Sequence, residues 1–412
     1  MSRRVFVVGP LVCLALAVAH QRAVAQSDPG PRPRARELGL SRHIGGTPGP
    51  IDAITDVAGV EVGHATIVEG EGALVVGQGP VRTGVTVVHP RGRAGTDPVF
   101  GAWFTLNGNG EMTGTTWLEE GGLLEGPVAI TNTHSVGVVR DAILQWQVTR
   151  PGLQPWGLPV VAETYDGGLN DINGFHVKPG HVLRALESAT GGPVAEGNVG
   201  GGTGMVCHQF KGGIGTASRV LAAEAGGYTV GVLVQCNYGA RADFRVAGVP
   251  VGLEITDLLP CREAAVADGW QGRRCDQPSP PAREEAAGDG SIIVIVATDA
   301  PLLPHQLKRI ATRVSLGIGR TGGFGGNGSG DIFLAFSTAN PQAAAGQGVV
   351  RIEMLPNARI SALFQATVQA TEEAILNALL AADTMVGANT LRVSALPRDR
   401  LMEAMRKYGR GQ

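Results

Sequence analysis

The sequence is poor in aromatic residues, in net charge and in metal-binding motifs. These shortages count against an aromatic core, a nucleic-acid or lipid partner and a metal centre. Aromatic side chains make up 5% of the 412 residues, so the core must be built from Ala, Val, Ile and Leu. The 34 basic and 36 acidic residues leave a net charge of -2, which offers no field for nucleic acid or anionic lipid. No Cys or His spacing resembles a metal site and HExxH is missing, so the sequence predicts no metal centre.

Glycine, by contrast, is in excess. The chain contains 62 glycines, about twice the ordinary share, which implies many tight turns and many close approaches of backbone to backbone or ligand. Hydrophobic residues make up 43% of the chain. This is enough for a large core in one large domain or in two ordinary ones.

The N-terminus has the three regions of a secretory signal. The basic start MSRR, the apolar run over residues 5–19 and the triplet AVA ending at Ala25 follow in that order. We therefore expect residues 1–25 to be a signal peptide, residues 26–37 to be a disordered leader, and the protein to be exported to the periplasm or secreted. A transmembrane anchor is the alternative, but the apolar run is short for a span and polar residues follow it.

Four cysteines remain once Cys13 leaves with the signal peptide. Cys261 and Cys275 bracket part of a polar, Pro-rich tract, and an oxidising compartment would permit a disulfide that closes this loop. Cys207 and Cys236 lie in apolar, strand-like runs, where we expect small buried side chains.

Apolar segments interleaved with helical patterns predict a layered α/β fold. The order is not a strict βαβ repeat, so sheets stacked between helices are favoured over a doubly wound parallel sheet. The predicted strands are 83–89, 99–105, 128–131, 158–162, 205–210, 214–220, 228–235, 291–297 and 332–337, with two more joined by a turn in 51–68. The predicted helices are 136–148, capped by Asn132 or Thr133, a segment around 182–186, 305–314, 360–382 and 398–408.

The stretch Gly288-Asp289-Gly290-Ser291 separates two unlike segments. Residues 262–290 are polar, Pro-rich and without apolar period, and are expected to form a flexible linker. The run IIVIVA that follows Ser291 is expected to be a buried strand. If the Gly290–Ser291 bond is cut, the new terminus carries a hydroxyl and a free amine that can act as its base, as an N-terminal nucleophile hydrolase requires. An ordinary loop-to-strand joint is the alternative.

A glycine-rich turn further on also has two interpretations. Residues 323–328 fit the dinucleotide pattern GxGxxG, but a helix precedes them and a strand follows, which is the reverse of what that site needs, and we reject it. Ser329 and Asp331 share a face if the segment is extended, so they could orient an amine or a hydroxyl. A turn capped by these two residues is the alternative.

Polar residues at two predicted strand ends are further candidates. Asn237 could stabilise an oxyanion, while Glu163 could bind a substrate ammonium and Tyr165 could donate to an oxyanion. Each is also explained as an ordinary turn or loop residue. His134 has no partner that the sequence can name, and we expect it to be packed or capping.

Seven motifs follow in a fixed order, and they read VAGVEVGHAT, ITNTHSVG, AETYDGG, VQCNYGAR, GSIIVIVATDAPLLPHQLKRIA, GNGSGDIFLAFST and TEEAILNAL. Together they resemble the DmpA family of peptidases, also called P1 or S58, which comprises L-aminopeptidase/D-esterases and β-peptidyl aminopeptidases. The resemblance covers residues 38–408. It implies a four-layer αββα sandwich that looks like N-terminal nucleophile hydrolases with different connectivity, and commonly a homotetramer.

The resemblance also implies a precursor that cleaves itself between Gly290 and Ser291. The products would be an α chain of residues 38–290 and a β chain of residues 291–412, which stay together in one catalytic domain. The linker, with its two cysteines, is longer than the family pattern leads us to expect.

Single positions match the family's functional residues. Ser329 and Asp331 match the serine and the acid that assist the nucleophile. Asn237 and Tyr165 match the oxyanion-stabilising positions, and Glu163 matches the acid that holds the substrate's free amine. The implied enzyme is a serine aminopeptidase that needs no metal or cofactor. L-amino-acid amides, D-amino-acid esters and β-peptides all stay open as substrates.

Two other classes remain as alternatives. The arginine-biosynthesis acetyltransferases also cleave themselves, but they normally use threonine and work in the cytoplasm, so Ser291 and the signal peptide count against them. An exported binding protein, in which the Gly290–Ser291 joint is only a turn, is the alternative without enzymatic activity.

Overall fold

The structure is a computed structural model that describes residues 32–411 except 154, 267–271 and 280–289. The folded body begins at Pro33. The expected signal peptide with Cys13, leader residues 26–31, and Gly288 and Asp289 lie outside the described residues. In the part of the chain that is described, no helix combines the length and the apolar character that a membrane span needs.

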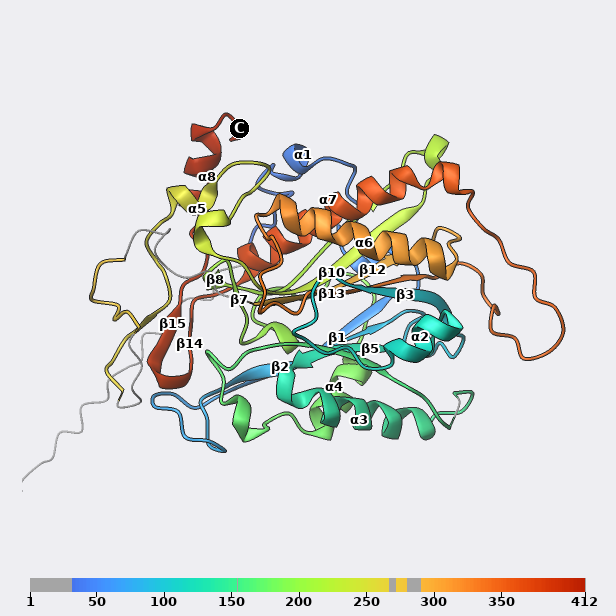
Figure 1. Ribbon diagram of the computed structural model, residues 1–412, viewed down its shortest axis with the longest axis horizontal. Coiled ribbons are helices and arrows are strands. Elements are labelled where there is room, and N and C mark those ends of the chain that lie inside the picture. The colour runs from blue at the N-terminus through green and yellow to red at the C-terminus, as the bar shows by residue number, and fades with distance from the viewer. Residues whose placement is uncertain (1–31, 154, 267–271, 280–289, 412) are drawn as a thin grey trace, which may run out of the picture. The chain divides into compact units, whose positions relative to one another are not determined.

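Two β-sheets lie between two layers of helices (Figure 1). One sheet has six strands in the order β4-β3-β13-β12-β10-β9, and the other has four in the order β1-β2-β5-β6. Helices α6 (Pro304–Arg320) and α7 (Ser361–Ala381) cover the six-stranded sheet, and α3 (Val136–Val148) and α4 (Pro179–Ser188) cover the four-stranded sheet. The fold is therefore the expected four-layer αββα sandwich.

The strands of the six-stranded sheet are β3 (Val99–Thr105), β4 (Leu123–Leu124), β9 (Gly213–Val220), β10 (Thr229–Asn237), β12 (Ser291–Thr298) and β13 (Ile332–Ser337). Those of the four-stranded sheet are β1 (Glu61–Glu69), β2 (Val81–His89), β5 (Val128–Asn132) and β6 (Val160–Thr164). Two small sheets contain β7 (Val206–Cys207), β8 (Phe210–Lys211), β11 (Cys261–Arg262), β14 (Met385–Val386) and β15 (Leu391–Val393). The remaining α-helices are α1 (Ser41–Ile44), α2 (Thr115–Gly121), α5 (Val251–Glu254) and α8 (Arg398–Lys407). The short 3-10 helices include η1 (Ile54–Asp56) and η2 (Thr133–Ser135).

Strand β12 shows why the run from Ile292 to Ala297 is apolar at every position. Successive side chains of a strand point to opposite faces. Here Ile292, Val294 and Val296 pack with the helices over one face, while the alternate residues pack against the other sheet. Both faces are buried, so apolar side chains fill the run on both sides.

Most predicted elements are confirmed, but α6 continues to Arg320, beyond the predicted end at 314, and three further details are wrong. Residues 51–68 contain one long strand, β1, after η1, because the segment before it forms a turn. Residues 205–210 contribute only to the two-residue strands β7 and β8. Helix α3 begins after Ser135 without a side-chain cap, because the Asn132 and Thr133 side chains donate to Thr83 and to Glu163 instead.

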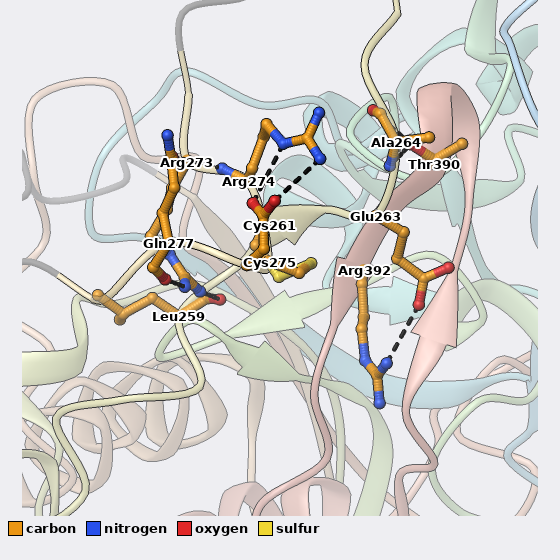
Figure 2. The surroundings of a disulfide bond; sticks show 11 residues. Leu259, Cys261, Glu263, Ala264, Arg273, Arg274, Cys275, Gln277, Thr390 and Arg392 are labelled. Carbon is orange, nitrogen blue, oxygen red and sulfur yellow. Dashed lines mark hydrogen bonds and ion pairs between the residues drawn. A yellow bond between two sulfur atoms is a disulfide. The ribbon is translucent and has the colours of Figure 1, made fainter.

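The described cysteines form two disulfides. Cys261 and Cys275 are bonded (Figure 2), which confirms the expected loop closure. Cys207 and Cys236 are fully buried as expected, but they too are joined, with their Cα atoms 5.6 Å apart. The pairing follows from the fold, because the chain after Cys207 runs beside the end of β10, where the His208 amide donates to the Tyr238 carbonyl at 2.7 Å.

Part of the expected linker is anchored rather than flexible. Strand β11 pairs with β15, and Glu263 forms an ion pair with Arg392 of that strand (Figure 2). The Arg262 amide also donates to the Arg273 carbonyl at 2.9 Å across the disulfide loop. The described residues next to both cysteines therefore belong to the folded body.

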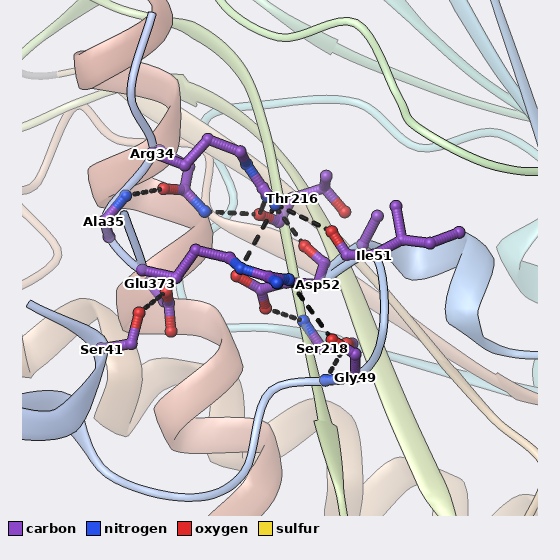
Figure 3. A network of polar contacts seen from close by, with 12 residues as sticks. Arg34, Ala35, Ser41, Gly49, Ile51, Asp52, Thr216, Ser218 and Glu373 are labelled. Carbon is purple, nitrogen blue, oxygen red and sulfur yellow. Dashed lines mark hydrogen bonds and ion pairs between the residues drawn. The ribbon is translucent and has the colours of Figure 1, made fainter. Parts of the chain in front are cut away.

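The end of the expected leader is ordered as well, which corrects the prediction for residues 33–37. Arg34 forms an ion pair with Glu196 at 2.7 Å, and its guanidinium donates to the carbonyl of Thr216 at 2.6 Å (Figure 3). The amide of Ala35 donates to Asn377 of α7 at 2.9 Å. These partners are distant in sequence, so the polar composition of the segment gave no sign of them.

Candidate active site

Four strand ends meet at one edge of the six-stranded sheet. Strand β10 runs antiparallel to β12, so its last residue, Asn237, pairs with Ser291, the first residue of β12. Strand β13 runs parallel to β12, which places the Ser329-Gly330-Asp331 turn before β13 beside Ser291. Strand β3 is antiparallel to β13, so the loop that follows Thr105 reaches the same place.

The four-stranded sheet contributes the opposite wall. Strands β5 and β6 are parallel, so the residues at and after their carboxyl ends, Thr133 and Glu163, lie together. Between the two sheets opens a cavity of about 480 Å³, and it is lined by Asn109, Gly110, Glu111, Thr133, Glu163, Tyr165, Asn237, Gly290, Ser291 and Gly328.

Ser291 lies in this cavity with its candidate partners. The amide of Gly330 donates to Ser291 Oγ at 3.2 Å. Ser329 Oγ lies 2.7 Å from Asp331 Oδ1 and also contacts the carbonyl oxygen of Gly290. The carbonyl of the peptide bond before Ser291 therefore accepts from the Ser329 hydroxyl, while the Ser291 hydroxyl accepts from Gly330.

Asp331 completes this group beside the Gly290–Ser291 bond. Its Oδ1 accepts from the Ile292 amide at 3.2 Å, and the side chain is buried. Burial raises the pKa of Asp331, although the hydrogen bonds from Ser329 and Ile292 work in the other direction. The hydroxyl of Ser329 has one proton for two acceptors, so a protonated Asp331 leaves that proton for the Gly290 carbonyl.

Asn237 is held by both ends of its amide. Its Oδ1 accepts from the Val206 amide at 2.7 Å, and its Nδ2 donates to the Tyr165 carbonyl at 2.9 Å. The Nδ2 group has two protons, and the second is available to donate to another acceptor. The Tyr165 side chain is 56% exposed, and the residue lines the same cavity.

Glu163 is the buried carboxylate of the opposite wall, with 3% of its surface exposed. Its Oε1 accepts from the Glu111 amide at 2.9 Å, and its Oε2 accepts from Thr133 Oγ1. Burial raises the pKa of Glu163, and the nearby Glu111 carboxylate adds to the rise, while the two hydrogen bonds oppose it. The net direction is upward. A cation that entered beside Glu163 would favour its ionised form.

The structure brings together every site residue expected from the sequence. It also adds residues that sequence reasoning missed, namely Thr133, Glu111 and the loop Asn107–Glu111. The letters NGNGE directly after a predicted strand were the available signal. His134 does not line the cavity; it is exposed and stacks on Phe175 with ring centroids 5.7 Å apart. Among the described residues, no group of three or more His, Cys, Asp and Glu side chains could hold a metal ion.

Comparison with known proteins agrees with this geometry. The model of peptidase family S58 matches residues 52–393. The chain belongs to peptidase family S58. That match spans both walls of the cavity and both sides of the Gly290–Ser291 bond.

Several named proteins and solved structures are similar to the chain over most of its length. The chain is 56% identical to a β-peptidyl aminopeptidase, BapA, of Sphingosinicella microcystinivorans, over 92% of this chain and 93% of the relative. A β-aminopeptidase structure from Burkholderia sp. superposes with a TM-score of 0.78 at 50% identity, covering 92% of this chain and 99% of that one. An L-aminopeptidase D-Ala-esterase/amidase from Ochrobactrum anthropi, described as a variant of the Ntn hydrolase fold, gives a TM-score of 0.80 at 45% identity, covering 92% and 100%.

The S58 member described here is thus a hydrolase with an N-terminal nucleophile, a serine aminopeptidase. The acetyltransferase and the binding-protein alternatives are not favoured.

Proposed function

We propose that the chain cleaves its own Gly290–Ser291 bond and then uses Ser291 to remove N-terminal residues from peptides, amides or esters. The observation that carries the proposal is the contact of Ser329 Oγ with both the Gly290 carbonyl and Asp331. It supports a polarised scissile carbonyl next to the hydroxyl that attacks it.

In the self-cleavage step, Ser291 Oγ attacks the Gly290 carbonyl carbon, and the C–N bond breaks to give an ester and the free Ser291 amine. Water then hydrolyses the ester, which leaves a carboxylate on Gly290 and restores the hydroxyl. A free α-amine has a pKa of about 7.7–8.0, so near neutral pH a useful fraction is unprotonated and can accept the proton of the hydroxyl.

In substrate turnover, Ser291 attacks the carbonyl of the substrate's first residue, the amine or alcohol leaves, and water releases the acyl group. Asn237, with an amide proton to spare, and Tyr165 are proposed to stabilise the oxyanion. Glu163 is proposed to pair with the free ammonium of the substrate. Its burial supports a strong charge-assisted contact, because a desolvated carboxylate gains more from a cation than an exposed one does.

For the substrate class, we propose peptides and amides with an N-terminal β-amino acid. The high identity to the enzymes named β-peptidyl aminopeptidase supports this choice. α-Amino-acid amides and D-amino-acid esters are the second candidate, favoured by the similarity to the enzyme from Ochrobactrum anthropi. Comparing kcat/KM for the β-alanine and L-alanine p-nitroanilides decides between them.

We further propose that residues 1–25 direct export, as their basic, apolar and small-residue regions support, and that the enzyme assembles as a homotetramer, as members of the family commonly do. N-terminal sequencing of the exported protein tests the first proposal. Light scattering of the purified enzyme tests the second.

Self-cleavage is tested with Ser291→Ala. The variant lacks the attacking oxygen, so we expect one uncut polypeptide without activity, whereas the wild type gives two chains whose masses divide at Ser291. Intact-mass spectrometry measures both. Two chains from Ser291→Ala, or a wild type that stays intact while it is active, would refute the assignment of the nucleophile.

A further inference from the structure

One loop of the α-chain segment, Asn107–Glu111, touches both walls of the cavity. At one end it is bound to the turn before β13. Asn107 Oδ1 accepts from the Asp331 amide at 2.9 Å, and Asn107 Nδ2 donates to the Gly326 carbonyl at 2.9 Å. The Asn109 amide donates to the Ser329 carbonyl at 3.2 Å. The residues that flank the nucleophile are therefore held from the α-chain side.

At its other end the same loop holds Glu163. The Glu111 amide donates to Glu163 Oε1 at 2.9 Å. Between these two attachments Gly110 is wedged: a Cβ atom there would lie 3.0 Å from Gly330 Cα and 3.3 Å from Glu163 Oε1. Gly330 is equally confined, because a Cβ atom on it would lie 2.4 Å from the Asn109 carbonyl oxygen. The contact with Gly330 is backbone against backbone, whereas Glu163 contributes its side-chain carboxylate.

The separation that this loop spans has a chemical meaning. Gly330 donates to the Ser291 hydroxyl, and Glu163 is the proposed partner of the substrate ammonium. A β-amino acid has one carbon more between its amine and its carbonyl than an α-amino acid has. That adds up to about 1.5 Å, the length of one C–C bond, and a misplacement of about 1 Å can cost about 100-fold in rate.

We propose that the loop Asn107–Glu111 sets the distance between the nucleophile and Glu163, and so determines the length of amino-acid backbone that the enzyme accepts. The inference rests on the proposed function, because it takes Glu163 as the ammonium site. Gly110 is the position that controls the spacing, since a Cβ atom on it would meet both Gly330 and Glu163.

The test compares Gly110→Ala with Gly108→Ala in the self-cleaved enzyme. Both changes add one methyl group to the same loop, but a Cβ atom at Gly108 meets nothing within 4 Å. The substrates are the p-nitroanilides of β-alanine and L-alanine, which are isomers that differ only in the position of the amine. The readout is the ratio of their kcat/KM values, with kcat and KM resolved for each.

A methyl group at position 110 pushes Gly330 and Glu163 apart. We expect the ratio of the β-alanine to the L-alanine kcat/KM to rise about tenfold in Gly110→Ala. This is less than the roughly 100-fold change in rate for a displacement of about 1 Å, because the methyl group moves its neighbours by less than that. We expect the ratio in Gly108→Ala to stay within twofold of the wild type. An unchanged or lowered ratio in Gly110→Ala, or an equal change in both variants, would overturn the proposal.

A second variant keeps the inference testable if Gly110→Ala does not fold. Asn109→Ala removes the Nδ2 hydrogen bond to the Gly328 carbonyl, 2.7 Å long and exposed, and loosens the same attachment. It should shift the ratio at least threefold, and an unchanged ratio contradicts the proposal. The wild-type ratio alone tests the β-amino-acid preference, whichever way the variants respond. If the wild type hydrolyses neither substrate, both the proposed function and the proposal about the loop are overturned.

Discussion

Replacing Gly290 by alanine should slow self-cleavage strongly, and the structure indicates by how much. A Cβ atom on Gly290 would lie 2.1 Å from the carbonyl oxygen of Asn237, 2.8 Å from Tyr238 Cα and 3.0 Å from the Asn237 carbonyl carbon. All three atoms belong to backbone at the end of β10, which is paired with β12. Neither side can yield as a flexible side chain would.

The size of the effect follows from the displacement. A carbon atom approaches a carbonyl oxygen to about 3.3 Å without strain, so residue 290 must move by about 1 Å. Its carbonyl then leaves the contact with Ser329 and the line of attack of the Ser291 hydroxyl. A misplacement of this size costs about 100-fold in rate, which corresponds to about 2.7 kcal/mol in the activation free energy.

The assay is the half-time of chain cleavage in freshly purified precursor, followed on denaturing gels and by intact mass. Gly137→Ala is the matched control, because a Cβ atom there meets nothing within 4 Å, and it should cleave at the wild-type rate. Far-UV circular dichroism against the uncut Ser291→Ala precursor shows that Gly290→Ala is folded. A folded Gly290→Ala that cleaves within threefold of the wild-type rate would refute the argument from the close contact.

Three further predictions address the substrate amine, the N-terminal segment and the disulfide loop. Glu163→Gln should lower kcat/KM for substrates with a free amine by about 10- to 100-fold, the worth of a hydrogen bond to a charged group, and leave N-acetylated esters unchanged. Protonation of the Ser291 amine sets the first loss of activity on the acid side. Since burial raises the pKa of Glu163 and its carboxylate is the binding form, a second loss should begin above pH 4.3 and be missing in the variant. Arg34→Ala leaves Glu196 without its ion-pair partner, while Asp52 keeps Arg219. It should lower the free energy of unfolding in urea by about 3 kcal/mol, against less than about 0.5 kcal/mol for Arg36→Ala, which removes only longer hydrogen bonds to backbone carbonyls. Serines at both Cys261 and Cys275 should lower it by about 3 kcal/mol or less with kcat/KM within twofold of the wild type.

Distinct outcomes would contradict these expectations. Equal losses on amine-bearing and N-acetylated substrates would remove the ammonium role of Glu163, as would a variant that keeps the second loss of activity on the acid side. Similar unfolding curves for the two arginine variants would mean that the buried pairs of Arg34 contribute no stability. A large loss of activity without the disulfide would connect its loop to the cavity, although no lining residue of the cavity belongs to that loop.

The strands and the site were predictable where the information is local. The run IIVIVA predicted a strand buried on both faces, and β12 is one. The site residues were recognisable as polar groups at strand ends, and they meet because strands β10, β12 and β13 end or begin at the same edge. Without the family resemblance, each of them had an equally good explanation as a turn residue.

What the sequence could not supply was long-range pairing. Arg34 sits in a polar, Pro-rich segment, yet its partner Glu196 lies 162 residues away. From the sequence, Cys207 and Cys236 are two unrelated core residues, and only the packing of the β7–β8 hairpin against β10 brings them together. The loop Asn107–Glu111 reads as a glycine turn, because its partners Asp331 and Gly326 follow more than 200 residues later. In each case local composition is the same for a free segment and for an anchored one.

The order of the six-stranded sheet explains how the two chains of the proposed cleavage would stay together. Its strands run β4-β3-β13-β12-β10-β9, so the β-chain strands β12 and β13 lie at the centre, with α-chain strands on both sides. The ladder from β12 to β10 extends from Ser291 to Thr298, and β13 pairs with β3 along its whole length. Separating the chains would break both ladders and expose the two cores that they bury. Cutting one peptide bond at the edge of the sheet removes none of these contacts, so dissociation of the chains should require the same disruption as unfolding of the domain.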